Sequence, residues 1–306
     1  MAKNLFFLGL IIAASGFVPP PIALLGGLVY GFAVEHPFPA ESRRLSKFLL
    51  QASVIALGFG MNLHQVFTAG RSGFLYTALS ITLTMLLGLT LGRLFGVGKT
   101  PAFLISAGTA ICGGSAIAAI GPVANANEEE MAVSLGAVFI LNSVALFLIP
   151  WLGFHFGMTQ EQFGLWSALA IHDTSSVVGA AARYGAAALA IATTIKLVRA
   201  LWIVPLSVVT AGVMKSKARI QWPWFIFLFC VAAVFNSLLP RLAPVFVQFH
   251  HLGTIGMAGT LFLIGTGLDK TALRKVGFQP LLQGLVLWLI VGATTLFSIR
   301  WHWINL

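Results

Sequence analysis

The stretch ALAIHDTSSVVGAAARYG, residues 168–185, places a histidine, an aspartate and three hydroxyl residues inside an apolar run. The chain around it has 306 residues, of which 58% are hydrophobic and 8% charged, and its mean hydropathy is +0.94. Apolar stretches recur from end to end, and a membrane span needs about 20 mostly apolar residues. They lack the alternating pattern of strands in a membrane β-barrel. The sequence therefore predicts an all-α polytopic membrane protein.

Eleven apolar segments, joined by short connections, are expected to cross the membrane as helices. We interpret the whole chain, 1–306, as a single membrane transporter domain. Residues 1–18 would form an extra N-terminal helix, and residues 19–152 and 160–302 two five-helix repeats of opposite orientation. The segments span residues 4–18, 20–35, 47–68, 73–93, 101–121, 131–151, 162–183, 188–212, 222–239, 252–268 and 279–299.

Two similar stretches suggest the inverted repeat. GTAICGGSAIAAIG (108–121) in the fifth segment and GTIGMAGTLFLIG (253–265) in the tenth both begin Gly-Thr and carry a small-small-hydroxyl triplet. Segments that lie five apart cross the membrane in opposite senses, as an inverted repeat requires. Short matches of this kind also arise by chance in helices rich in Gly and Ala. Interrupted, crossing helices are expected in such a repeat, with the fifth segment as the leading candidate.

Basic residues are distributed unevenly over the connections between segments. If the N-terminus and every second connection lie on one side, that side carries twelve Lys and Arg residues and the other carries four. The positive-inside rule then places the N-terminus in the cytoplasm and the C-terminus outside, in a bacterial inner membrane. The twelve are Lys3, Arg43, Arg44, Lys47, Arg93, Lys99, Lys215, Lys217, Arg219, Lys270, Arg274 and Lys275; the four are Arg71, Arg183, Arg241 and Arg300.

The seventh segment carries His172 and Asp173 well inside its apolar run. Ionisable residues at membrane depth are costly and indicate a functional site. Asp173 would pair with a cation or take up a proton, and His172 titrates near neutral pH. We expect the pair to couple ion or proton movement, with Ser175 in the polar lining of the site. The alternative is that the pair caps a helix near the cytoplasmic surface.

The eighth segment carries Lys196 and Arg199, three residues apart and therefore on one face of a helix. Asp173 can neutralise only one of these two cations. The surplus positive charge makes an oxyanion the natural ligand, and the guanidinium fork suits sulfate, sulfonate or carboxylate geometry. The alternative is that both side chains extend to the membrane interface.

The fifth segment contains Gly113, Gly114 and Ser115, which favour an interruption of the helix. A helix restarted there would present free backbone N–H groups to an anion. By the match between segments, Gly259 and Thr260 would add to the same substrate site. The alternative is an unbroken helix whose small residues pack against a neighbour.

Other polar residues point to structure rather than chemistry. Interhelical hydrogen bonding is the better interpretation of Asn62, Asn142 and Asn236. No spacing of metal ligands and no nucleotide-binding motif is present, so we expect no metal, no cofactor and no energising ATPase domain. The net charge of +10 is scattered over short loops, so we interpret it as a topology signal and expect no nucleic-acid partner. The expected partners are membrane lipid and, from the two basic residues of the eighth segment, a small anionic solute. The sequence does not decide whether the protein forms a homodimer.

Several motifs together resemble the YeiH-type family of sulfate exporters. The resemblance implies a relationship to carriers with two inverted five-helix repeats and crossed, interrupted helices, a group that includes sodium/proton antiporters and bile-acid symporters. Three motifs of that family match positions of this sequence: Ile111–Ile117, the pair His172 and Asp173, and the pair Lys196 and Arg199. The resemblance also implies export of sulfate or sulfonates. The motifs are LGFGMNL, AICGGSAIAAIGPV, HDTSSVVGAA, KLVRALWIVPL, WFIFLFCVAAVFNS and LDKTALRKVGFQPLLQGLVLW.

The leading hypothesis is a secondary transporter that moves a small oxyanion by alternating access, and not an enzyme. Lys196 and Arg199 would compensate the charge of the substrate, while His172 and Asp173 would couple proton or ion movement. Two alternatives are a cation/proton antiporter with Asp173 as its ion site and a passive anion channel. A membrane-embedded enzyme would need a nucleophile or metal cluster that the sequence does not display.

Overall fold

A computed structural model describes residues 2–61, 63–215, 223–267, 276–301 and 303. Every regular element in these ranges is a helix, as the composition predicts. Asn62 and five of the counted basic residues, Lys217, Arg219, Lys270, Arg274 and Lys275, lie outside them. The helices are α1 (Ala2–Ala13), α2 (Pro20–Ala33), α3 (Pro39–Gly58), α4 (Leu63–Leu94), α5 (Lys99–Ala110), α6 (Gly114–Ile120), α7 (Glu128–His155), α8 (Gln160–Ala170), α9 (Thr174–Tyr184), α10 (Ala186–Leu201), α11 (Ile203–Met214), α12 (Trp224–Leu238), η1 (Pro240–Leu242), α13 (Ala243–Thr266) and α15 (Phe278–Arg300).

Four helical stretches within the described ranges are long and apolar enough to cross a membrane. A fifth span is formed if α12 and η1–α13, which are bent by 99° at their junction, are counted together. α1 and α2 are shorter apolar helices. The protein is therefore a membrane protein built from helices. The four stretches are Thr77–Leu94, Glu129–His155, Ala186–Met214 and Phe278–Arg300.

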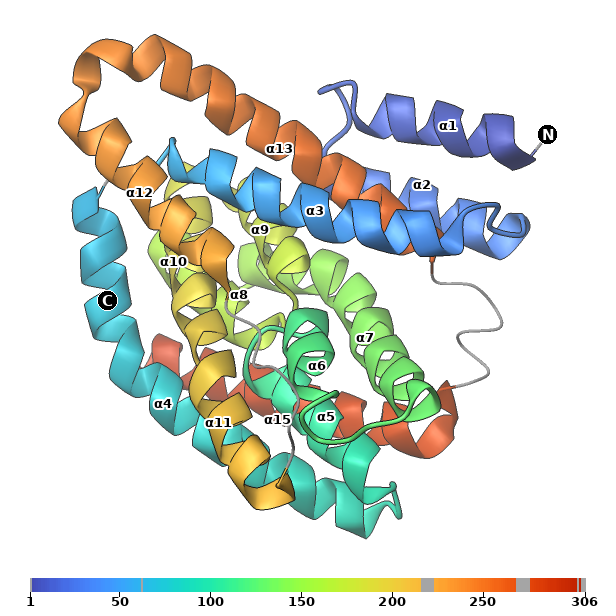
Figure 1. The fold of residues 1–306 in the computed structure, drawn as a ribbon. Coiled ribbons are helices and arrows are strands. Elements are labelled where there is room, and N and C mark those ends of the chain that lie inside the picture. The colour runs from blue at the N-terminus through green and yellow to red at the C-terminus, as the bar shows by residue number, and fades with distance from the viewer. Residues whose placement is uncertain (1, 62, 216–222, 268–275, 302, 304–306) are drawn as a thin grey trace.

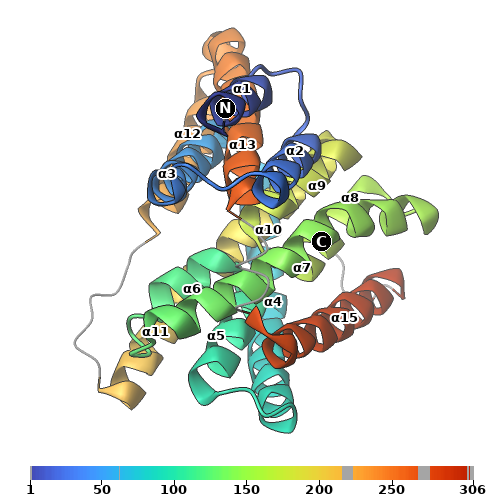
Figure 2. The same cartoon turned by 90° about the vertical axis from the view of Figure 1, so that its right-hand side faces the viewer.

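The helices form two bundles, which Figures 1 and 2 show from two sides. In the first, here called the α13 bundle, α1, α2, α3 and α12 gather around the long helix α13. The second, here called the crossing bundle, contains α4 to α11 and α15. The bundles meet mainly where α9 and α7 approach α13 and α2, and where α12 approaches α4. Few helix pairs therefore join the two bundles.

Two of the expected segments are interrupted near their middle by three residues outside any helix, whereas the eighth divides only at Trp202, into α10 and α11, which together form one span. The fifth becomes α5 and α6, separated at residues 111–113, and the seventh becomes α8 and α9, separated at residues 171–173. These two segments lie two apart along the chain, not five as the matched stretches implied. One interruption falls in each of the two expected halves of the chain, as the fourth segment of the first half and the first segment of the second.

The tenth segment is not interrupted, which corrects the inference drawn from its match with the fifth. α13 continues through Gly259 and Thr260, and the Thr260 hydroxyl donates to the Gly256 carbonyl within the same helix at 2.8 Å. Gly253 of this helix serves close packing, since a Cβ there would lie 2.9 Å from the Ser53 carbonyl oxygen of α3, whereas a Cβ at Gly259 would meet only Leu49 at 3.9 Å. Small residues alone do not distinguish a packing face from a break.

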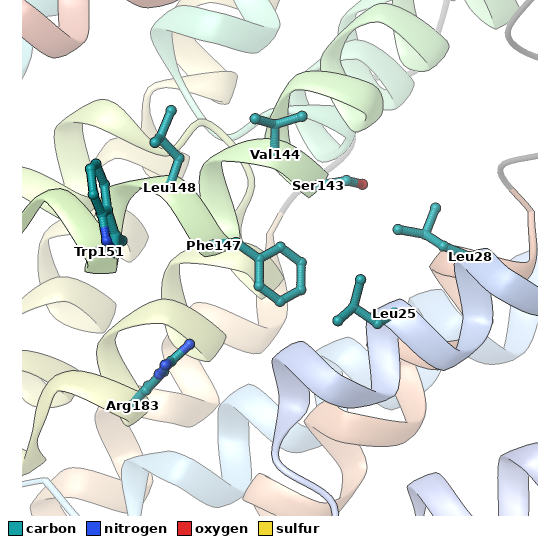
Figure 3. Close-up of a pocket in the computed structure, with 8 residues that line it drawn as sticks. All are labelled: Leu25, Leu28, Ser143, Val144, Phe147, Leu148, Trp151 and Arg183. Carbon is teal, nitrogen blue, oxygen red and sulfur yellow. The ribbon is translucent and has the colours of Figure 1, made fainter.

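A groove of about 640 Å³ opens at the junction of the two bundles (Figure 3). Leu25 and Leu28 of α2 line one side, residues of α7 line the other, and Arg183 of α9 lies at the edge. The bundles are thus incompletely packed against each other on this side. The α7 residues are Ser143, Val144, Phe147, Leu148 and Trp151.

Contact between α2 and α13 requires glycine at position 27. A Cβ there would collide with the Phe262 carbonyl oxygen and lie 3.1 Å from the Gly265 Cα, whereas a Cβ at neighbouring Gly26 meets nothing within 4 Å. We expect Gly27→Val to destabilise the protein by about 1–3 kcal/mol through overpacking. Gly26→Val makes the same change in helix propensity and should leave stability nearly unchanged. Thermal unfolding in detergent measures both, and equal melting temperatures would contradict this account of the packing.

Candidate functional site

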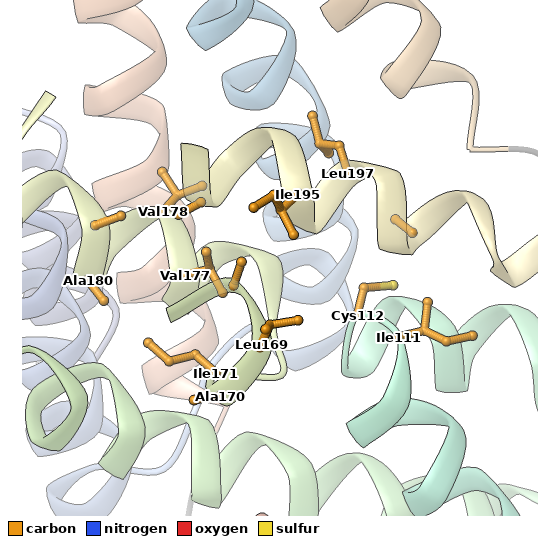
Figure 4. Close-up of a cluster of buried hydrophobic side chains, with 14 of the residues drawn as sticks. Ile111, Cys112, Leu169, Ala170, Ile171, Val177, Val178, Ala180, Ile195 and Leu197 are labelled. Carbon is orange, nitrogen blue, oxygen red and sulfur yellow. The ribbon is translucent and has the colours of Figure 1, made fainter. Parts of the chain in front are cut away.

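The first break lies between α5 and α6, and its sharpest turn is at Gly113. This residue has φ +67° and ψ −129°, a conformation that L side chains rarely adopt. Its N–H donates to the Gly108 carbonyl at 2.8 Å, and α6 restarts at Gly114. Ile111 and Cys112 complete the break and belong to the buried apolar cluster that also contains Ile195 and Leu197 of α10 (Figure 4). The expected interruption at Gly113–Gly114 is thus present.

The second break lies between α8 and α9, and Asp173 begins the new helix. Its carboxylate accepts from the Ser176 N–H at 3.1 Å, from the Ser176 hydroxyl at 3.3 Å, and from the Ser175 hydroxyl. The hydroxyl residues that follow Asp173 are therefore partners of its charge. This is a helix cap, as the alternative interpretation held, but Asp173 is only 4% exposed and is buried inside the bundle of helices.

The two breaks cross in direct backbone contact. A Cβ built on Gly113 would lie 3.0 Å from the Asp173 Cα and 3.2 Å from the His172 carbonyl oxygen. Any side chain at position 113 would push the two breaks apart. Positive φ and this close approach both demand glycine, and they bring the fifth and seventh segments together at one point, here called the crossing.

Lys196 and Arg199, which are both 0% exposed, reach the crossing from one face of α10. Lys196 Nζ donates to the Ile171 carbonyl at 2.8 Å and to the Ala168 carbonyl at 3.4 Å, at the end of α8. The Arg199 guanidinium donates to two carbonyl groups at the end of α5 and to one hydroxyl of α4. These are the Ala110 carbonyl, the Ile111 carbonyl at 3.5 Å and the Ser80 hydroxyl at 3.3 Å. Neither side chain extends to the membrane interface.

These contacts match the charges to the helix dipoles. The C-terminal ends of α5 and α8 are partially negative and hold Arg199 and Lys196, while the partially positive N-terminus of α9 holds Asp173. Both cations therefore have carbonyl partners of their own. No salt bridge forms between Asp173 and either cation; the carboxylate caps the end of α9 and interacts with Lys196 at longer range.

Asn142 of α7 holds the second break in place. Its Oδ1 accepts from the backbone N–H groups of His172 at 2.9 Å and Asp173 at 3.2 Å, and its Nδ2 donates to Val138 at 2.8 Å. The expectation of an interhelical hydrogen bond is met here, and also at Asn236, whose Nδ2 donates to the Met61 carbonyl at 3.0 Å. The position of Asn142 at the crossing was not foreseen; an amide inside an apolar run was its only signal.

His172 has a buried ring nitrogen with no hydrogen-bond partner. Its Nε2 is unpaired although the residue is 1% exposed, and His172 interacts electrostatically with Lys196 and Arg199. A buried polar atom without a partner is costly and indicates a missing ligand or water. The crossing thus has hydrogen-bonding capacity that the protein itself leaves unused.

The structure gathers most of the predicted site residues at the crossing. Gly113, His172, Asp173, Ser175, Lys196 and Arg199 meet there. Gly114 instead faces the Phe139 ring of α7, and Ser115 is half-buried on α6. Gly259 and Thr260 belong to the α13 bundle and are not part of the crossing. No residue of the crossing lines the groove of Figure 3 or the smaller cavity of about 200 Å³ near Arg300.

The hydrogen bonds of Asn142 make a testable prediction. Asn142→Ala would leave two buried N–H groups without an acceptor, at a cost of about 1–3 kcal/mol for each. Ser143→Ala is a matched control, because the Ser143 hydroxyl bonds only within α7, to Phe139. Thermal unfolding of both variants in detergent should show a clear loss for Asn142→Ala alone. Similar unfolding temperatures would mean that α8 and α9 do not depend on this amide.

Comparison with known proteins places the chain in a family of membrane proteins. The family model described as "Conserved hypothetical protein 698" matches residues 6–284. A UPF0324 membrane protein of Bacteroides thetaiotaomicron is 47% identical over 287 residues, which cover 93% of this chain and 87% of the relative. A UPF0324 membrane protein of Geobacter sulfurreducens is 43% identical over 303 residues, covering 99% and 98%. No solved structure matches the chain significantly. The chain thus belongs to the UPF0324 family of membrane proteins.

Proposed function

We propose that this protein is a secondary transporter that moves a small oxyanion, sulfate-like or a sulfonate, across the inner membrane by alternating access. The observation that carries the proposal is the pair of fully buried cations, Lys196 and Arg199, beside a single buried carboxylate, Asp173. Buried charge is expensive in a membrane and is retained where it serves a substrate. The resemblance to YeiH-type sulfate exporters points to the same class of solute.

The two cations keep capacity for an anion despite their carbonyl contacts. A guanidinium has five N–H donors and an ammonium has three. Arg199 contacts three acceptors and Lys196 contacts two, so N–H groups remain for a ligand. The unpaired Nε2 of His172 supplies one more polar group. An oxyanion at the crossing would replace its hydration shell with these groups.

A cation/proton antiporter is less well supported by the same contacts. The carbonyl groups at the ends of α5 and α8 are the natural ligands for a metal cation at interrupted helices. Here they already accept from Arg199 and Lys196. Asp173 accepts hydrogen bonds from Ser175 and Ser176, so its carboxylate is not free to bind a metal cation. We assign it the role of a fixed negative charge opposite Lys196 and Arg199.

Alternating access would arise from movement of the crossing bundle against the α13 bundle. Every residue of the crossing belongs to the crossing bundle, and few helix pairs join the two. The groove between α2 and α7 leaves room at their junction. The proposal includes eleven membrane crossings, with residues 19–152 and 160–302 as inverted halves that each contribute one interrupted helix. It also makes the protein a carrier rather than a passive channel.

Loss of either buried cation should abolish transport. We expect Arg199→Gln and Lys196→Gln to lower the uptake of labelled sulfate or methanesulfonate into proteoliposomes by at least about tenfold, because a hydrogen bond to a charged group contributes about 1.5–3 kcal/mol. Lys99→Gln removes the same charge at the exposed start of α5 and should transport normally. Wild-type flux should saturate and show counter-transport. Normal flux in both crossing variants would remove the basis for the proposal.

Eleven crossings place the two chain ends on opposite sides of the membrane. Alkaline phosphatase fused after Leu306 should be active, since the C-terminus is proposed to lie outside, and a fluorescent protein fused there should stay dark. The same reporters fused before Met1 should give the opposite pattern. Matching patterns at both ends would contradict the odd number of crossings.

A further inference from the structure

The crossing has an uneven count of buried charges. Among the side chains whose burial the structure describes, which exclude those of residues 62–76 and 128, the charged ones that are buried are Asp173, Lys196 and Arg199. The Asp173 carboxylate accepts from Ser175 and Ser176, which is the pattern of an ionised group. Lys196 and Arg199 donate to carbonyl oxygens at the partially negative C-terminal ends of α8 and α5, which favour their positively charged forms. The side chains of the crossing therefore carry one net positive charge.

Neither the helix ends nor His172 changes this count. Two C-terminal and two N-terminal half-helix ends meet at the crossing, and their partial charges cancel. Protonation of His172 would add a third cation beside Lys196 and Arg199, so its ring is counted as neutral. His172 is only 1% exposed, and its Nε2 has no hydrogen-bond partner. This unpaired nitrogen is independent evidence that the crossing binds a ligand with hydrogen-bonding atoms.

We infer that the site selects anions that carry a single negative charge over anions that carry two. This inference rests on the proposed function and specifies its substrate class. A monovalent anion brings the buried crossing to neutrality. A divalent anion changes the net charge from +1 to −1, which leaves an uncompensated buried charge of the same size as in the empty site. Because an unpaired charge is costly away from water, only the monovalent anion removes that cost.

Methanesulfonate and sulfate are the probes that separate the two cases. Both present a tetrahedral sulfur–oxygen group, and at pH 7 they carry one and two negative charges. Calorimetric titration of the purified wild-type protein at matched ionic strength should show methanesulfonate binding at least about tenfold more tightly than sulfate. Sulfate binding as tightly as methanesulfonate, or more tightly, would overturn the inference and leave an anion transporter standing.

A change of charge at Asp173 tests whether the net charge of the crossing causes the preference for methanesulfonate, since it leaves the shapes and hydration of the two anions unchanged. Asp173→Asn raises the net charge of the crossing to +2 and keeps a good helix cap, because Asn caps about as well as Asp. The affinity for methanesulfonate divided by the affinity for sulfate should fall by at least about tenfold relative to the wild-type protein. Asp173→Ser, which also supplies a capping oxygen, is a second neutral variant. Glu161→Gln is the control, because it removes an equal charge at the exposed start of α8 and should leave the ratio unchanged.

The outcomes separate this inference from the proposed function. An affinity ratio that stays the same in both folded Asp173 variants would show that net charge does not set the selectivity, even if anions bind. Binding of neither probe to the wild-type protein, nor of other monovalent or divalent oxyanions, would overturn the proposed function and this inference together.

Discussion

The structure depends on the need to satisfy backbone groups where two helices stop in the buried interior of a membrane protein. Four helix ends meet at the crossing, where free N–H and carbonyl groups are buried away from water. The protein meets this need with side chains of α7, α10 and the second break itself. Arg199 and Lys196 bind the carbonyl ends of α5 and α8, Asp173 caps α9, and Asn142 binds the N–H groups of the second break.

One helix supplies both cations, and this couples the two breaks. Lys196 contacts the end of α8 and Arg199 the end of α5, one turn apart on the same face of α10. A displacement of α10 would disturb both half-helices at once. The crossing therefore behaves as a single polar unit inside an apolar bundle, and a ligand bound there would interact with all of its parts.

The same contacts revise the electrostatic picture of the site. Two lysine or arginine side chains in a membrane helix suggest free positive charge, whereas here each has backbone partners. What remains is a net imbalance of one charge, shared over Asp173, Lys196 and Arg199, together with unused donors and the unpaired His172 nitrogen. Selectivity by net charge follows from this balance more directly than from any single hydrogen bond.

The sequence by itself determined the helical membrane class, and it predicted, with alternatives, an interruption at Gly113–Gly114 and the burial of His172, Asp173, Lys196 and Arg199. These features follow from local hydropathy, from glycine in a break and from the cost of charge in lipid. Only the tertiary structure decided that the fifth segment crosses the seventh rather than matching an interrupted tenth, and that Asn142 lies at the crossing. The reason is physical: Gly113 and Gly259 have similar neighbours along the chain. Gly113 becomes a break because Arg199, which is distant in sequence, satisfies the carbonyl end of α5, whereas the α13 backbone at Gly259 satisfies itself within a continuous helix.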